Sequence, residues 1–352
     1  MCGNKLALTL LIVGLIVVAC APAPAPAVAP TPSAVPATTA PLVKLQSAWS
    51  MMNSDPAPVW VAVDVGFFKQ NGLDVSLVFI DGGTKHAQAL ISKDVAMGVT
   101  SAAPVVSAAA GGADLELVLG MVNVINYDFL VRPGIKTAAD LKGKKVAVSG
   151  ASGSSNTAMR LALKTLFNLD PDKDVITMSV GNEAEREVAL MSGQIDATVV
   201  NPDTSIKAKK DGLVVLDSLW GKPVPYAHTG VGVTKAFAKD NPEVVANYLK
   251  SIIQAIGYIK DPANKTNVVK IFGKYLKADD QEMLDSMYTR MSQTILQCVP
   301  YVPMDGMATV IGETKTAVSA GLTADKVVDN SFVKSLDDSG FIKANCKERG
   351  NQ

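Results

Sequence analysis

The sequence contains very few histidines, no excess of either charge and no closely spaced pair of cysteines. Its 352 residues include only two histidines, His86 and His228, and this number excludes a metal site built from three histidines. Lysine and arginine together number 33, as do aspartate and glutamate. Because proteins that bind nucleic acid normally carry a basic excess, we expect no nucleic-acid partner. None of the four cysteines belongs to a C-x-x-C pair, the spacing typical of zinc and thiol-redox sites.

The sequence patterns of common catalytic sites are also missing. Residues 150–154 (GASGS) lack the last glycine of the nucleophile motif G-x-S-x-G, and they lack the Gly-Lys-Ser/Thr that completes a P-loop. Glu183, Glu185 and Glu187 lie at the start of a predicted helix, where acidic side chains suit the helix dipole without any catalytic role. We therefore predict that the chain is not an enzyme and uses no cofactor and no metal ion.

The first 19 residues are predicted to be a signal peptide. An uncharged and mostly apolar run over residues 6–19 is too short to span a bilayer comfortably, but it has the length of a secretory hydrophobic region. The run ends in Val-Val-Ala before Cys20, which resembles the lipobox of bacterial lipoproteins. This resemblance implies cleavage before Cys20 and acylation of that residue, with chains such as palmitate. An ordinary signal peptide or a buried N-terminal helix is the alternative.

A linker rich in alanine and proline follows Cys20. Residues 21–41 contain eight alanines, seven prolines, three threonines and no charge. Prolines at this spacing prevent a helix and favour extended polyproline II, which would reach roughly 65 Å at about 3.1 Å per residue. We expect no later membrane span, because the best candidate, residues 104–125, is interrupted by Gly111-Gly112, Asp114 and Glu116. The expected location is therefore the cell envelope, with a soluble body held outside the cytoplasm by a lipid anchor.

Cys298 and Cys346 are the cysteines that remain in the predicted soluble body. Proteins outside the cytoplasm meet an oxidising environment, so a disulfide between them would close the C-terminal region. Two unpaired thiols are the alternative, and nothing around either cysteine indicates a nucleophile.

Hydrophobic periodicity predicts alternating strands and helices from residue 42 onward. Residues 42–49 and 74–80 are predicted strands, and apolar residues recur at every fourth position between them, as expected on one face of a helix. A helix over residues 87–92 and a short strand over residues 95–100 follow. This strand–helix–strand–helix–strand order is typical of a parallel sheet covered by helices.

The same pattern recurs one hundred residues later. Residues 89–99 (ALISKDVAMGV) match residues 189–199 (ALMSGQIDATV), and a strand over residues 144–148 with a helix over residues 152–167 precedes the second copy. Two lobes with one plan would place the carboxyl ends of their strands at a shared cleft, where open parallel sheets bind ligands.

The C-terminal part of the sequence is predicted to be helical. Four helices are expected there, over residues 241–259, 267–276, 280–293 and 304–320. They would pack behind the lobes. We predict that lobe I comprises residues 43–128 together with 228–352, and that lobe II comprises residues 129–227.

Five short segments, in order along the chain, are similar to those of one protein family. They are GFFK at residues 66–69, GIKTAADLKGKKV at 134–146, SGQIDA at 192–197, FAKDNPEVV at 237–245 and DDSGFI at 337–342. Together they resemble the solute-binding proteins of ABC importers for nitrate, sulfonate, taurine and related compounds, the NMT1/THI5-like group. The resemblance extends over residues 43–343.

This resemblance implies an α/β protein with the two-lobed type II periplasmic-binding fold. Each lobe would be a mainly parallel sheet flanked by helices, with a helical C-terminal region. A sulfonate, an aromatic carboxylate, nitrate or a pyrimidine-type compound would be captured between the lobes and delivered to an ABC permease in the cytoplasmic membrane. We expect a monomer. A sensory ligand-binding module would look the same, and a pyrimidine-precursor synthase of this fold would carry a cysteine-rich motif that is missing here.

Candidate ligand-binding residues lie in the loops that follow the predicted strands. They are Trp49, Ser50, Asp81, Gly83, Thr84, Ser101, Ser152, Ser154, Ser155, Asn201, Tyr226 and His228. The loop at residues 150–156 opens a helix, whose unpaired N–H groups and dipole favour an anion, although a serine cap under solvent is the alternative. Trp49 either stacks on a planar ligand or caps the core, and a lone histidine such as His228 is more often structural. Neutral polar residues at these positions favour a small organic anion or aromatic acid over a cation.

Overall fold

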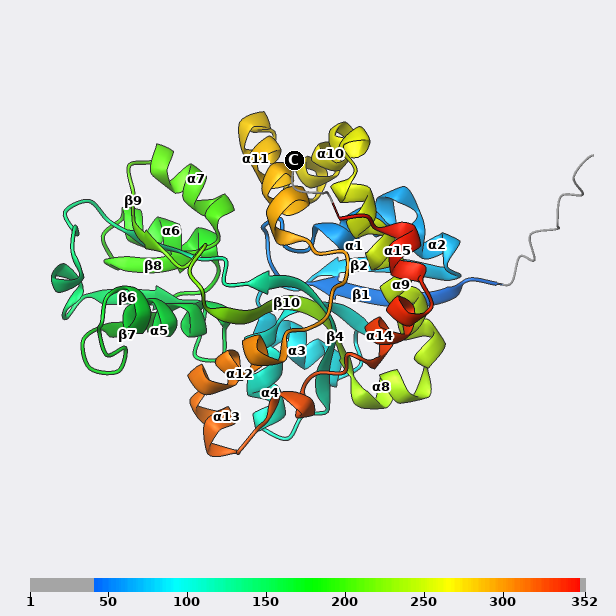
Figure 1. The fold of residues 1–352 in the computed structure, drawn as a ribbon. Helices are drawn as coiled ribbons and strands as arrows, with labels where there is room; N and C mark the ends of the chain where they lie inside the picture. The colour runs from blue at the N-terminus through cyan, green and yellow to red at the C-terminus, as the bar shows by residue number, and fades with distance from the viewer. Residues whose placement is uncertain (1–40, 349–352) are drawn as a thin grey trace, which may run out of the picture. The chain divides into compact units, whose positions relative to one another are not determined.

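A computed structural model of the chain describes residues 41–348 (Figure 1). The predicted signal peptide, Cys20 and the linker up to residue 40 lie outside the described residues. From residue 41 onward the chain forms one compact unit. In this part of the chain, no helix combines the length and hydropathy that crossing a bilayer requires.

The first of two five-stranded sheets has four strands that point the same way and one that opposes them. Its order is β2 (Leu73–Phe79), β1 (Val43–Trp49), β3 (Met97–Ser101), β10 (Pro225–Thr234) and β4 (Leu115–Val124). Strand β1 pairs in parallel with β2 and β3, whereas β10 is antiparallel to both β3 and β4. Strand β10 is therefore the single reversed strand.

The second sheet repeats this plan. Its order is β7 (Ile176–Ser179), β6 (Lys145–Val148), β8 (Ala197–Val200), β5 (Asp128–Val131) and β9 (Val214–Ser218). Strand β6 is parallel to β7 and β8, and β5 is antiparallel to β8 and β9. The fold class expected from the sequence is confirmed, since both sheets are mainly parallel and have helices around them (Figure 1).

The reversed strand of each sheet is the one by which the chain enters that sheet from the other. The chain leaves β4 of the first sheet, passes through residues 125–127 and begins β5 of the second. It returns from β9 through residues 219–224 to β10. The repeated segments occupy equivalent places, because α3 (Gly83–Ile91) precedes β3 and α6 (Glu183–Met191) precedes β8.

Helices fill the remainder of the described chain. The other α-helices up to β9 are α1 (Ala57–Val65), α2 (Phe67–Gln70), α4 (Ala102–Ala110), α5 (Ser154–Leu166) and α7 (Pro202–Lys210). The later ones are α8 (Lys235–Asp240), α9 (Pro242–Lys260), α10 (Lys265–Leu276), α11 (Gln281–Arg290), α12 (Met304–Glu313), α13 (Lys315–Ser319), α14 (Ser331–Asp338) and α15 (Phe341–Asn345). A π-helical turn over Met291–Ile295 continues α11. The single helix predicted for residues 304–320 is two helices, because Thr314 has an extended backbone (φ −101°, ψ 97°).

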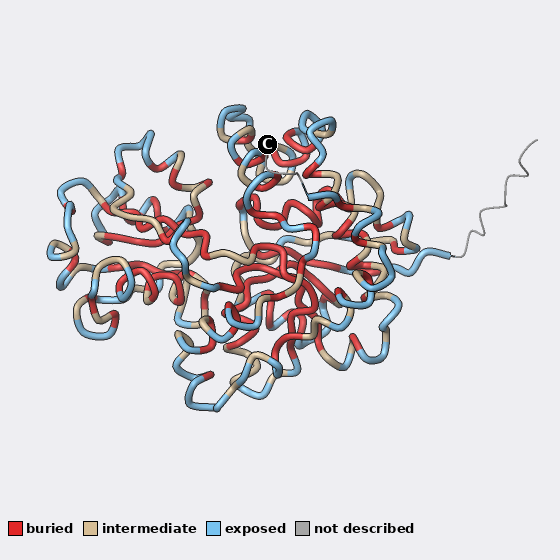
Figure 2. The backbone as a smooth tube through the Cα atoms, viewed as in Figure 1, coloured by how far each residue is buried: buried red, intermediate tan, exposed pale blue. Residues whose placement is uncertain are grey.

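One hydrophobic core contains side chains of both sheets. Another lies between the first sheet and the helices α1, α9 and α10, in a region of mostly buried backbone (Figure 2). Trp60, Tyr248 and Phe272 are among its fully buried side chains. A disulfide bond joins Cys298 to Cys346, the residue directly after α15. These contacts attach the helical C-terminal region to the first sheet.

Candidate ligand-binding site

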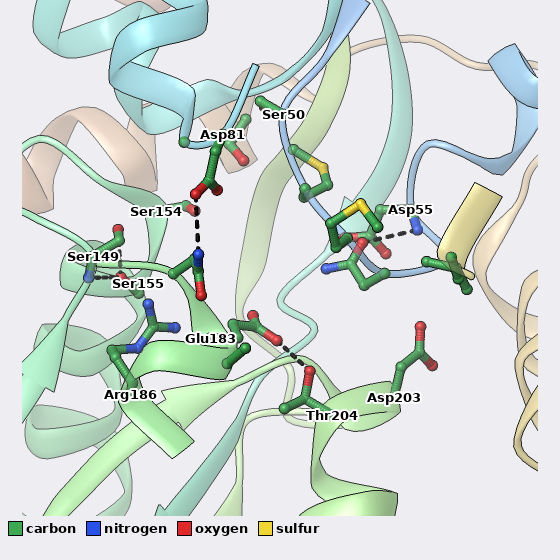
Figure 3. A pocket seen from close by; sticks show the side chains of 18 of the residues that line it. Ser50, Asp55, Asp81, Ser149, Ser154, Ser155, Glu183, Arg186, Asp203 and Thr204 are labelled. Atoms are coloured by element: carbon green, nitrogen blue, oxygen red, sulfur yellow. Dashed lines mark hydrogen bonds between the residues drawn. The ribbon is translucent and has the colours of Figure 1, made fainter. Parts of the chain in front are cut away.

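A cavity of about 450 Å³ lies where the parallel strands of both sheets end (Figure 3). From the first sheet it is lined by residues after β1 and β2, by the end of β3 and by His228 of β10. From the second sheet it is lined by residues after β6, β7 and β8. This is the edge at which open α/β sheets bind ligands, since loops of several strands converge there.

Seven of the twelve predicted ligand-binding residues line this cavity, namely Ser50, Asp81, Gly83, Ser101, Ser154, Ser155 and His228. The other five do not line it, namely Trp49, Thr84, Ser152, Asn201 and Tyr226. Contact of any of these residues with a ligand stays a prediction.

Trp49 and Tyr226 each lie one side chain behind the cavity wall. Trp49 packs against Phe79, with ring centroids 5.4 Å apart, and Phe79 lines the cavity. Tyr226 is 1% exposed and packs against the ring of His228 at 5.9 Å. Both residues therefore support a lining side chain. Trp49 also belongs to the hydrophobic core, and its stacking on a ligand stays a prediction.

The start of α5 presents hydrogen-bond donors to the cavity. Gly153 precedes the helix without a side-chain cap, and within residues 41–348 no acceptor takes up the N–H groups of Ser154 and Ser155. Tyr127 donates its hydroxyl hydrogen to Ser154 Oγ at 2.9 Å, and the Ser149 N–H donates to Ser155 Oγ at 2.7 Å. These contacts fix the first turn, whose free N–H groups and dipole suit an anion.

Arg186 is a cavity residue that the sequence reasoning missed. It is 1% exposed, and it donates from Nε to Thr198 Oγ1 at 2.9 Å and from Nη2 to Val199 O at 3.1 Å. Its Nη1 donates to Gly181 O at 2.5 Å, so each nitrogen of the guanidinium makes one hydrogen bond. Burial lowers the pKa of Arg186, and the nearby Glu183 opposes that shift. In Figure 3 its guanidinium points toward Ser155.

The internal repeat of the sequence gives a reason to expect that Arg186 is buried. Carried three residues further toward the N-terminus, the match of residues 89–99 with 189–199 aligns His86 with Arg186. Both are almost fully buried polar residues at the same position of equivalent helices, α3 and α6. Helix α6 itself begins with a reciprocal cap, in which Asn182 and Glu185 exchange side-chain and backbone hydrogen bonds.

Two acidic side chains at the cavity come from different sheets. Glu183 accepts hydrogen bonds from the Asn201 N–H at 3.1 Å and from the Thr204 hydroxyl, and burial raises its pKa. Asp81, which follows β2, accepts from Asn182 Nδ2 at 3.0 Å. The second contact joins a loop of the first sheet to a loop of the second.

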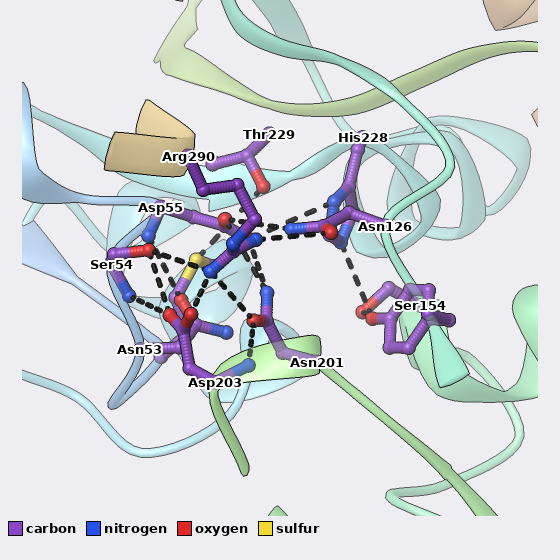
Figure 4. A network of polar contacts seen from close by, with 12 residues as sticks. Asn53, Ser54, Asp55, Asn126, Ser154, Asn201, Asp203, His228, Thr229 and Arg290 are labelled. Atoms are coloured by element: carbon purple, nitrogen blue, oxygen red, sulfur yellow. Dashed lines mark hydrogen bonds and ion pairs between the residues drawn. The ribbon is translucent and has the colours of Figure 1, made fainter. Parts of the chain in front are cut away.

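A buried polar network lies beside the cavity and connects both sheets with α11 (Figure 4). Arg290, the last residue of α11, forms an ion pair with Asp203 and donates to Asn126 Oδ1 at 3.1 Å and Ser54 Oγ at 3.2 Å. Asp203 Oδ2 accepts from the Ser54 N–H at 2.9 Å and from the Ser54 hydroxyl at 2.7 Å. Burial lowers the pKa of Arg290, and Asp55 opposes that shift.

Asp55, Asp203 and His228 are among the residues of this network that line the cavity. Asp55 is 0% exposed, and His228 Nδ1 lies 3.7 Å from Asp55 Oδ2. The other ring nitrogen of His228 lies 3.3 Å from the Tyr127 hydroxyl. Burial lowers the pKa of His228, so the ring is neutral near pH 7, and the Asp55 carboxylate opposes this shift.

One part of the cavity wall is apolar and rich in methionine. Its members are Met51, Met52, Phe79, Leu276, Ala278, Met283 and Met287. Methionine adapts its shape to irregular ligands because its side chain is unbranched and polarizable. The cavity therefore offers a polar wall and an adaptable apolar wall to one ligand.

Comparison with known proteins gives this site a family context. The NMT1/THI5 like family model matches residues 53–265. The taurine-binding periplasmic protein of Escherichia coli (strain K12) is 28% identical over 243 residues, which are 63% of this chain and 71% of that protein. The riboflavin-binding protein RibY of Chloroflexus aurantiacus is 23% identical over 259 residues, which are 71% of this chain and 72% of that protein.

Solved structures show the same fold. The alkanesulfonate-binding protein SsuA from Xanthomonas axonopodis pv. citri, bound to MOPS, aligns with a TM-score of 0.65 and 18% identity over 82% of this chain and 96% of that chain. The periplasmic nitrate-binding protein NrtA from Synechocystis PCC 6803 aligns with a TM-score of 0.68 and 14% identity over 85% and 89% of the two chains. These relatives and structures are binding proteins and not enzymes. Because the family model spans more than half of its residues, the chain belongs to the NMT1/THI5-like family, and it has the fold of periplasmic binding proteins.

Proposed function

We propose that this chain is a lipid-anchored solute-binding protein of an ABC importer, which captures a small organic anion outside the cytoplasm and delivers it to the permease. In this proposal, lobe I comprises residues 43–128 and 228–352, lobe II comprises residues 129–227, and the cavity lies between them. Membership of the family and the binding roles of its relatives support the proposal. Closure of the lobes on the ligand would be the state that the permease recognises.

The donors on the lobe II wall are the observation that carries this proposal. Ser154 and Ser155 bring free N–H groups at the positive end of the α5 dipole, and Arg186 brings a buried guanidinium to the same wall. Free helix N-terminal amides bind anions, and a guanidinium matches the geometry of carboxylate and sulfonate groups. We assign the anionic group of the ligand to this wall.

The opposite wall favours an organic body on the ligand. Ser50, Ser101 and His228 would provide polar contacts from lobe I, and the methionine-rich wall would cover the apolar part. The cavity volume of about 450 Å³ falls within the range of roughly 300–1,000 Å³ that is typical of small-molecule sites. These features favour an organic sulfonate or carboxylate over a bare inorganic anion.

A thermal-shift screen of the chain from residue 42 onward tests this function. The compounds are sulfonates, aromatic carboxylates, nitrate, bicarbonate and aminopyrimidines. A ligand at one hundred times its Kd should add about 2.7 kcal/mol to the free energy of unfolding. Ser154→Trp should abolish that gain and leave the fold intact, whereas Ser319→Trp at the exposed end of α13 should keep it. A screen without any shift would contradict the proposed ligand class.

Labelling with radioactive palmitate tests the lipid anchor separately. Wild-type protein expressed in a bacterial host should take up the label and sediment with membranes. Cys20→Ala should lose both properties, and Cys2→Ala, which changes another cysteine near the N-terminus, should keep them. Equal labelling of the Cys20→Ala variant would exclude Cys20 as the attachment point.

A further inference from the structure

Some buried polar atoms of lobe I line the cavity without a hydrogen-bond partner among the described residues. Ser50 is 5% exposed and His228 is 4% exposed, and both line the cavity. Within residues 41–348, neither Ser50 Oγ nor His228 Nδ1 has a hydrogen-bond partner. Buried polar atoms are normally paired, so two unpaired ones at one wall indicate that a ligand supplies the missing contacts.

The buried carboxylate of Asp55 also lacks close hydrogen-bond donors, and it carries a charge. It is 0% exposed, yet its hydrogen-bond donors are the amides of Asn126 and Asn201, all at 3.4 Å, and the neutral ring of His228 lies at 3.7 Å. These separations are long for hydrogen bonds to a charged oxygen, which are usually about 2.7–2.9 Å. A buried carboxylate without short donors is costly.

Two neighbouring carboxylates show what full pairing looks like here. Asp203 accepts two hydrogen bonds from Ser54 at 2.9 and 2.7 Å and forms the ion pair with Arg290. Asp128 accepts from the hydroxyl of Ser218 at 2.7 Å and also from a second serine, Ser205. Asp203, which also lines the cavity, and Asp128 therefore both have short hydrogen bonds that Asp55 lacks.

The pairing of the charged side chains around the cavity supports the same inference. Glu187 pairs with Lys207 at 3.0 Å, and Glu183 lies near Arg186. Asp55 has no charged group within ion-pair distance among the described side chains, and Arg290, which interacts with it electrostatically, forms its ion pair with Asp203 instead. A ligand with only negative charge would be repelled by the Asp55 carboxylate at this wall.

We propose that the ligand carries a protonated nitrogen in addition to its anionic group, and that Asp55 binds this nitrogen with help from Ser50. The inference rests on the proposed function and deepens it, because it narrows the substrate to an amine-bearing organic anion. The two charged ends then meet opposite parts of the cavity. In Figure 3 Asp55 lies on one side of the view, and Ser155 and Arg186 lie on the other.

Matched compounds that differ only in the amine test this inference by titration calorimetry. The pairs are taurine with ethanesulfonate, para-aminomethylbenzoate with para-toluate, and para-aminomethylbenzenesulfonate with para-toluenesulfonate. In at least one pair, the wild-type protein should bind the amine at least about tenfold more tightly, as expected for a hydrogen bond to a charged group. Asp55→Asn should reduce this ratio to near one and leave the affinity for the compound without the amine unchanged.

Two further variants keep the experiment decisive. Asp240→Asn, at an exposed carboxylate that ends α8, should keep the wild-type ratio. Ser50→Ala removes an unpaired hydroxyl and should fold normally, so it replaces Asp55→Asn as the test if that variant is unstable. It should lower the ratio of the affinities with and without the amine by roughly threefold.

The outcomes separate this inference from the proposed function. Binding of the anions with no preference for the amine, or a preference that survives in both Asp55→Asn and Ser50→Ala, would overturn the inference and leave the proposed function standing. Absence of binding by every compound of the three pairs would overturn the inference, and the wider thermal-shift screen then decides the proposed function.

Discussion

Asp81 and Asn182 meet at the cavity wall, with Asn182 Nδ2 donating to Asp81 Oδ2 at 3.0 Å. The two residues follow β2 and β7, which are equivalent edge strands of the two sheets. The contact therefore joins equivalent loops of the two lobes. In the lobe closure that we propose, this contact would favour the closed form and raise the apparent affinity of a ligand that needs closure.

Removing this contact should weaken ligand binding indirectly. Asp81→Ala should lower the affinity for a ligand found in the screen by about fivefold, which corresponds to about 1 kcal/mol for one such hydrogen bond. Small-angle scattering of the ligand-free variant should show a larger radius of gyration than wild type. Asp94→Ala, at an exposed aspartate of lobe I, is the control and should change neither quantity. An unchanged radius would show that the contact does not hold the lobes together.

The ion pair between Arg290 and Asp203 should contribute strongly to stability. Their side chains are 14% and 3% exposed, so Arg290→Met would leave a buried carboxylate without its cation. We expect the free energy of unfolding to fall by about 3 kcal/mol, measured by urea denaturation. Lys334→Met breaks an exposed pair with Asp338 and should have little effect. Equal effects of the two substitutions would contradict this account.

The plan of the two sheets could be predicted because it depends on local patterns that occur twice. The match of residues 89–99 with 189–199 indicates two copies of one helix–strand unit, and the structure places α3 with β3 and α6 with β8 at equivalent positions. The reversed direction of β5 and β10 could not be predicted. It depends on how the chain crosses between the sheets, which is a long-range property.

The candidate site was predictable where it follows strand ends. Ser50 and Ser154 were expected at the cavity for this reason, and they line it. From the sequence, Asp55 would be interpreted as the residue that begins a helix, and the lining methionines would be interpreted as core residues. Arg186 looks like a surface charge on an amphipathic helix. These residues are recognised as cavity residues only from the packing of two lobes around one cavity, which the local sequence does not reveal.

Burial of His86 should make the protein less stable in mild acid. The residue is 0% exposed, and burial lowers its pKa from 6.5 to about 4. The unfolded chain therefore takes up a proton between pH 6.5 and pH 4 that the folded chain does not. The stabilisation is complete above pH 6.5 and is lost as the pH falls toward 4, by about 3 kcal/mol.

Urea denaturation of His86→Gln between pH 4 and pH 7 checks this expectation. Glutamine is polar and uncharged at every pH, so the variant should lose much less stability across this range than wild type does. His228 stays in both proteins, and its lowered pKa should give them a smaller dependence of the same sign. Identical pH dependence of the two proteins would show that His86 does not titrate in this way.

Glu116 should have the opposite pH dependence. It lies on β4 and is 8% exposed, and burial together with the nearby Asp329 raises its pKa from 4.5 to about 7. The folded chain holds a proton that the unfolded chain releases, so this stabilisation is present below pH 4.5 and is lost as the pH rises through 7. Glu116→Gln imitates the protonated form and should raise the free energy of unfolding at pH 8 by about 1–2 kcal/mol, with little change at pH 4.5. Glu282→Gln, at a side chain that is 86% exposed, is the control. If Glu116→Gln raised the free energy of unfolding equally at both pH values, titration of Glu116 would be excluded as the cause.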